Sequence, residues 1–78
     1  MTDEILLDMR NREPPEPLFA TLDAVEELQP GQLIRLLIHR EPLMLYPQLQ
    51  QLGVPWKVES WGAPDWVIII GPRPDGSG

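Results

Sequence analysis

Residues 7–18 read Leu-Asp-Met-Arg-Asn-Arg-Glu-Pro-Pro-Glu-Pro-Leu, and this stretch decides the fold. It starts inside an apolar run, Ile5 to Met9, that is typical of a short strand. A polar loop follows from Arg10 to Glu13. The prolines after it cannot lie inside a helix but are tolerated in its first turn, so we predict that a helix begins near Pro15. A strand, a loop and a helix therefore open the chain.

Apolar spacing predicts two helices. The first ends at Gln29-Pro30-Gly31-Gln32, where proline second and glycine third suit a type II turn. The second opens after Glu41, with Pro42 in its first turn, and ends at Gly53. The residues expected to face the core at helical spacing are Leu18, Leu22, Val25 and Leu28 in the first helix and Leu45, Leu49 and Leu52 in the second.

Three further strands are predicted, over residues 33–38, 54–61 and 66–70. In residues 54–61, Val54, Trp56 and Val58 share one face, and Pro55 near the start suits an edge strand. Residues 66–70 are continuously apolar and suit the centre of a sheet. Residues 62–65 read as a hairpin loop, and we expect residues 72–78, rich in proline and glycine, to form a disordered tail.

The predicted element order is β-α-β-α-β-β. Each β-α-β crossover should be right-handed and make its two strands parallel, and the last two strands should form an antiparallel hairpin. The sequence therefore predicts an α+β fold, a two-layer βαβαββ sandwich with both helices on one face of a four-stranded mixed sheet. Residues 1–71 form its single domain.

The opening stretch resembles the signature of the TusA/SirA-like sulfur-carrier family, in which a Cys-Pro-x-Pro motif opens the first helix. Here the motif reads Pro14-Pro15-Glu16-Pro17, so proline stands in the cysteine's place. The resemblance covers about residues 4–71 and also rests on Leu7-Asp8 and on the turn at Pro30-Gly31. It implies the sheet order 1-2-4-3. The stretch His39-Arg40-Glu41-Pro42-Leu43-Met44-Leu45-Tyr46 is similar to one found in a cysteine-free, uncharacterised branch of these proteins.

Composition excludes several functions. The 78 residues include no cysteine, so neither a disulfide nor a persulfide can form, and we expect no sulfur transfer. The net charge of −6 argues against nucleic acid and anionic membranes as partners. The first residues are acidic and lack the basic region of a signal peptide, so we expect a cytoplasmic protein.

One end of the sheet gathers the candidate binding residues. Parallel first and second strands would bring the loop after each to the same end, where open α/β sheets favour ligands. These residues are Arg10, Arg12 and Glu13 after the first strand and His39, Arg40 and Glu41 after the second. They form either a small-ligand, anion or metal site or two neighbouring solvated loops. His39 has no serine nearby in this topology, so we expect neither enzymatic activity nor a cofactor.

The sheet face without helices is the second candidate surface. If Ile34, Leu36 and Ile38 face the helices, Leu33, Arg35 and Leu37 face away, together with Trp61. Exposed apolar patches commonly mark interaction sites. We therefore expect Leu33, Leu37 and Trp61 to meet another protein or a second copy in a weak homodimer. On this hypothesis the chain is a non-catalytic accessory module, with a link to sulfur or redox metabolism implied by the resemblance alone.

Overall fold

The computed structural model describes residues 4–13, 15–60 and 65–73. Over these residues the element order is the predicted one. The elements are β1 (Glu4–Asp8), α1 (Glu16–Glu26), β2 (Leu33–Ile38), α2 (Leu45–Leu52), β3 (Trp56–Ser60) and β4 (Trp66–Ile70).

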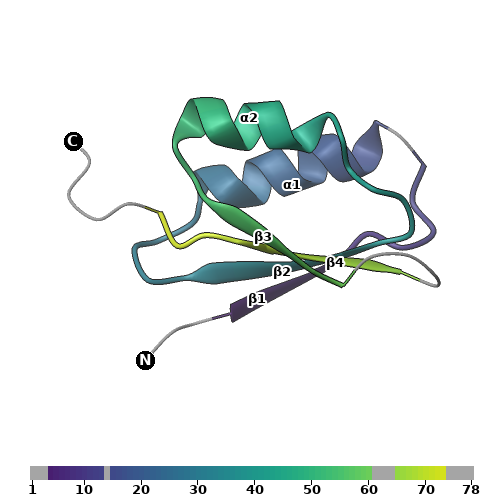
Figure 1. The fold of residues 1–78 in the computed structure, drawn as a ribbon, viewed down its shortest axis with the longest axis horizontal. Helices are drawn as coiled ribbons and strands as arrows, with labels where there is room; N and C mark the ends of the chain where they lie inside the picture. Colours follow the sequence, from purple (N-terminus) through teal and green to yellow (C-terminus); the bar gives the residue numbers. More distant parts are fainter. Residues whose placement is uncertain (1–3, 14, 61–64, 74–78) are drawn as a thin grey trace.

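The strands form one mixed sheet in the order β1-β2-β4-β3. β1 runs parallel to β2, while β4 is antiparallel to both β2 and β3. Figure 1 shows α1 and α2 side by side over the same face of this sheet. The predicted α+β sandwich and its sheet order are confirmed.

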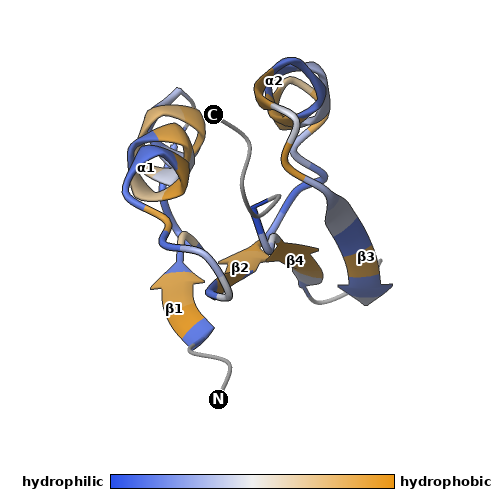
Figure 2. Ribbon diagram, turned by 90° about the vertical axis from the view of Figure 1, so that its left-hand side faces the viewer, coloured by the Kyte–Doolittle hydropathy of each residue, from blue (hydrophilic) through white to orange (hydrophobic). Residues whose placement is uncertain are grey.

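The core lies between the sheet and the two helices. Ile34, Leu36 and Ile38 of β2 are buried against the helices, together with Ile68 and Ile70 of β4. Figure 2 shows these two central strands as the apolar middle of the sheet. Each such side chain contributes roughly 1.5–3 kcal/mol when fully buried. Because side chains alternate along a strand, Leu33, Arg35 and Leu37 lie on the opposite face, where they are half-buried.

The buried side of α1 agrees in part with the prediction. Leu18 and Leu22 are partly buried and pack against the core, but the most deeply buried positions of the helix are Pro17, Thr21 and Val25. These three residues follow one another at four-residue spacing, which places them along one line of the helix. Leu28 is buried as expected, but it lies beyond the helix end at Glu26.

α2 begins later than predicted, at Leu45 instead of just after Glu41. The Leu43 amide donates to the Glu41 carbonyl (2.9 Å) and the Leu45 amide to the Pro42 carbonyl (2.9 Å). These short-range bonds form tight turns ahead of the helix. Its end at Gly53 is confirmed, with φ +72° and the Schellman bonding pattern.

Leu52 was predicted to face the core, and this is wrong: its side chain is 46% exposed. The helix stops at Leu52, and the chain turns back toward β3 at Gly53. Val54, whose amide donates to the Leu49 carbonyl at 3.0 Å, fills the buried position instead. β3 itself starts only at Trp56, and Pro55 precedes it.

The described chain ends with a contact back to the first helix. The Arg73 guanidinium donates to the carbonyl oxygens of Val25 (3.3 Å) and Glu26 (3.4 Å) at the C-terminal end of α1. Cations are favourable at this end of a helix. Arg73 belongs to the segment 72–78 that was expected to be disordered, and residues 74–78 lie outside the described part of the chain.

Candidate functional site

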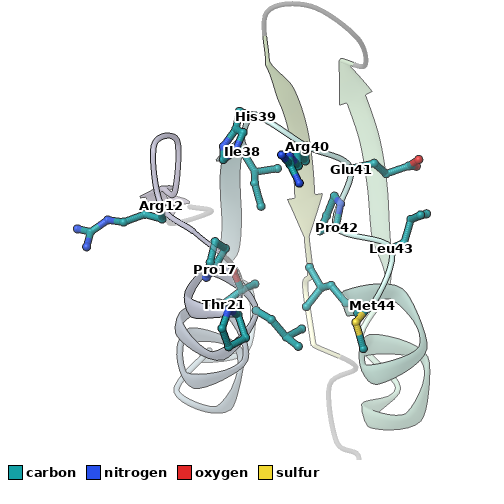
Figure 3. A pocket seen from close by; sticks show the side chains of 13 residues that line it. Arg12, Pro17, Thr21, Ile38, His39, Arg40, Glu41, Pro42, Leu43 and Met44 are labelled. Atoms are coloured by element: carbon teal, nitrogen blue, oxygen red, sulfur yellow. The ribbon is translucent and has the colours of Figure 1, made fainter.

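A cleft lies where β2 ends between the N-terminal ends of the two helices, and its volume is about 260 Å³. We call it the helix cleft. Figure 3 shows that its lining side chains come from the loop before α1, from α1, from the end of β2 and from the connection to α2. They are Arg12, Pro15, Pro17, Leu18, Thr21, Ile38, His39, Arg40, Glu41, Pro42, Leu43, Met44 and Leu45.

The cleft forms because each helix begins some residues after the strand that precedes it. Prolines precede the first turn of α1, and turns at residues 41–45 precede α2. Both helices therefore begin set back from the end of β2. The side chains of Leu18, Ile38 and Leu45 form an apolar interior, and the large exposed side chains of Leu43 and Met44 stand at its edge.

Thr21 is the exception inside this apolar interior. Its side chain is 1% exposed, and its hydroxyl has no hydrogen-bond partner among the described residues. A buried polar group without a partner costs about 1–3 kcal/mol. Such a group in a native protein calls for an explanation, and a polar ligand atom reaching into the cleft would supply its missing bond.

The charged residues of the cleft differ in how they are held. Arg12 forms an ion pair with Glu16 at 2.7 Å, and Glu41 accepts a hydrogen bond from the Tyr46 hydroxyl at 3.2 Å. In Figure 3, Arg12 and Glu41 extend outward on opposite sides, while His39 and Arg40 lie between them. His39 and Arg40 are exposed and form no hydrogen bond within the described residues.

Tyr46 is not among the lining residues of the cleft, but it contacts Glu41, which is. Its ring stacks on Trp56 with the centroids 5.4 Å apart and the planes 6° from parallel. Burial raises the pKa of Tyr46 to about 12, and the negative charge of Glu41 acts in the same direction. The phenol therefore stays protonated near neutral pH and keeps donating to Glu41. This contact joins the Glu41 side chain to Tyr46 in the first turn of α2.

The predicted binding end is brought together only in part. Arg12, His39, Arg40 and Glu41 line the helix cleft, whereas Arg10 and Glu13 are not among its lining residues. Arg10 instead forms ion pairs with Asp8 (2.8 Å) and with Asp65 at the start of β4 (3.3 Å). Glu13 is exposed.

Sequence reasoning missed the interior of the cleft. Thr21 was not singled out because threonine among leucines at helical spacing reads as a flank of the apolar stripe. Its position four residues after Pro17, and four before Val25, is the signal that could have placed it on the buried line. For the metal alternative, the described residues contain no group of three or more histidine, aspartate or glutamate side chains arranged to hold an ion.

The open sheet face carries both ion pairs and apolar side chains. Arg35 reaches across it, to Glu4 of β1 at 2.6 Å and to Glu59 of β3 at 2.7 Å. Beside it Leu6 is 62% exposed, and Leu37 is half-buried. Of the predicted interaction residues, Leu33 and Leu37 lie on this face, and Trp61 lies outside the described residues.

Comparison with known proteins gives one match. A family model described as "Uncharacterized conserved protein (DUF2249)" matches residues 6–72. No curated protein and no solved structure matches the chain. None of the helices in the described ranges has the length and apolar character needed to cross a membrane.

Proposed function

The chain belongs to the DUF2249 family of uncharacterized conserved proteins, and from this premise we propose that it is a binding protein without catalytic activity of its own. Its helix cleft holds a small, largely apolar ligand. The observation that carries this proposal is the hydroxyl of Thr21, which lines a largely apolar cleft and is buried without a hydrogen-bond partner among the described residues. Ligand sites in proteins commonly combine apolar walls with a few placed polar groups.

A neutral, compact probe tests this function. We expect cyclohexanol, titrated into the 15N-labelled chain, to shift the amide signals of Leu18, Thr21 and Leu45. Binding to the folded state should also raise the melting temperature. Thr21→Val keeps the shape of the side chain and removes its hydroxyl, so this variant should bind the alcohol less tightly.

The control is Leu6→Ser on the far face of the sheet, which should bind cyclohexanol as the natural chain does. The proposal fails if cyclohexanol leaves the amides of the cleft unshifted up to its solubility limit. It also fails if Leu6→Ser weakens binding as much as Thr21→Val.

We further propose that the family stands close to the TusA/SirA-like proteins. The element order and the sheet order β1-β2-β4-β3 support this relationship. The cleft is lined by Pro15 and Pro17, which belong to the stretch that resembles the sulfur carriers' cysteine motif. Because the chain has no cysteine, this end of the molecule would bind a ligand without forming a covalent bond to sulfur.

A second candidate function is protein interaction through the open sheet face. The exposure of Leu6, at 62%, beside half-buried Leu37 favours it. A second copy of the chain or another protein would cover these side chains. The two functions use opposite faces of the sheet, so variants on one face leave the other function intact.

A further inference from the structure

We propose that the ligand of the helix cleft is a small organic anion with its carboxylate at Arg40, its apolar body between α1 and α2, and a hydroxyl or carbonyl group at Thr21. This inference rests on the proposed function, since it names the chemical class of the ligand for the same cleft. It is carried by the way the arginines of the chain are partnered, by the charges around the rim, and by the buried hydroxyl.

Arg40 is the one arginine without a partner in the described ranges 4–13, 15–60 and 65–73. The other four are engaged by the protein's own oxygens. Arg10 pairs with Asp8 and Asp65, Arg12 with Glu16, Arg35 with Glu4 and Glu59, and Arg73 with the carbonyls of Val25 and Glu26. An exposed guanidinium that lines a cleft and has no internal partner is available to an external anion.

The carboxylate next to Arg40 in the chain does not pair with it. Arg40 and Glu41 both line the cleft, but no ion pair joins their side chains. Glu41 instead accepts a hydrogen bond from the Tyr46 hydroxyl. Glu41 also extends away from the cleft in Figure 3. The Arg40 guanidinium is therefore without an ion-pair partner in the described residues, and a ligand carboxylate can bind it there.

The interior of the helix cleft determines which chemical groups the rest of the ligand can carry. Leu18, Ile38 and Leu45 offer it only apolar contact, so the body must be apolar. The Thr21 hydroxyl needs one polar atom, which can either donate or accept a hydrogen bond. The volume of about 260 Å³ lies below the roughly 300–1,000 Å³ of pockets for drug-sized ligands. A single ring or a short branched chain fits these limits.

Three probes separate the contributions of the two polar groups. The first, 3-(4-hydroxyphenyl)propanoate, carries a carboxylate and a hydroxyl at opposite ends of an apolar body. The second, 3-phenylpropanoate, lacks the hydroxyl, and the third, 3-(4-hydroxyphenyl)propanamide, lacks the charge. Their dissociation constants are measured by NMR titration of the full chain and of Arg40→Gln, Thr21→Val and Arg35→Gln.

We expect the first probe to bind most tightly. Arg40→Gln should weaken its binding about tenfold and leave the amide's binding unchanged, because the variant removes the charged partner of the carboxylate alone. Thr21→Val should erase the advantage of the hydroxyphenyl over the phenyl probe. Arg35→Gln is the matched control, since Arg35 is paired with Glu4 and Glu59 on the open face of the sheet and does not line the cleft, and its effect should stay below about threefold.

Equal binding of the carboxylate and the amide to the natural chain would overturn the anion proposal. A loss of binding in Arg35→Gln as large as that in Arg40→Gln would overturn it as well. In either case binding of cyclohexanol in the cleft would leave the proposed function standing. If neither these probes nor cyclohexanol shifts the amides of the cleft, both the inference and the proposed function are wrong.

Discussion

At the scale of single residues, the hydroxyl of Thr21 should lower the stability of the fold. Its hydroxyl is buried and has no partner in the described chain, so Thr21→Val removes a desolvated polar group and keeps the volume. We expect this variant to unfold with a free energy about 1 kcal/mol higher than that of the natural chain. Urea denaturation followed by tryptophan fluorescence measures the difference. A variant that is less stable by a similar amount would mean that the hydroxyl already has a partner.

The contact between Asp8 and Arg10 makes the stability of the fold depend on pH in the acid range. Hydrogen bonds from the Arg10 side chain, and then from its amide, lower the pKa of Asp8 from an ordinary value of 3.8 to about 2. Because the folded-state pKa is the lower one, this stabilisation is complete above pH 3.8 and is lost as the pH falls toward 2.

Asp8→Asn should therefore lose less stability than the natural chain over this pH range. Melting temperatures measured at several pH values in low salt show the difference, and added salt should reduce it because the pair is exposed. Parallel curves for the two proteins would contradict the assignment.

At the scale of elements, two glycines end α2 and β4 in different ways. Gly53 has φ +72°, and open space surrounds the position of a Cβ atom. Gly71 has φ +108°, and a Cβ there would lie 2.8 Å from the Gln32 carbonyl oxygen. Gly53→Ala should cost about 1–2 kcal/mol through backbone strain alone. Gly71→Ala adds overlap with backbone and should cost more.

Denaturant unfolding of both variants measures how much free energy of unfolding each one loses. Because a domain of this size has little stability to lose, Gly71→Ala should be partly unfolded at room temperature. Equal losses for the two variants would show that the chain can move away from Gln32.

Local patterns predicted the elements well and their contacts less well. The alternation in residues 33–38 and the glycine at position 53 act within a few residues, so they placed β2 and the end of α2 correctly. The start of α2 depends on turns between Glu41 and Leu45 that hydrophobic spacing does not register. The Arg10–Asp65 pair joins residues 55 apart, and no local pattern reveals it. The partner of Arg10 was therefore missed, and with it the reason Arg10 stays out of the cleft.

At the scale of the whole molecule, the two faces of β2 should respond oppositely to the same change. Leu36 is fully buried against the helices, and Leu37 is half-buried on the open face. Leu36→Glu places a charge in the core and should unfold the domain. Leu37→Glu should leave it folded and abolish the self-association proposed for this face. Circular dichroism and light scattering over a range of concentrations measure the two effects. A natural chain that stays monomeric at high concentration would remove the case for a homodimer.

Arg73 connects the last described residues of the chain to the end of its first helix. It lies 48 residues beyond Val25, yet it supplies donors to the last carbonyls of α1. Because Arg73 follows β4 in the chain, we expect this contact to form only after β4 has joined the sheet. Arg73→Ala should therefore speed unfolding and leave the folding rate nearly unchanged, which stopped-flow kinetics can measure. In Arg73→Ala, the C-terminal turn of α1 should then open more readily, while the central strands keep their resistance to amide exchange.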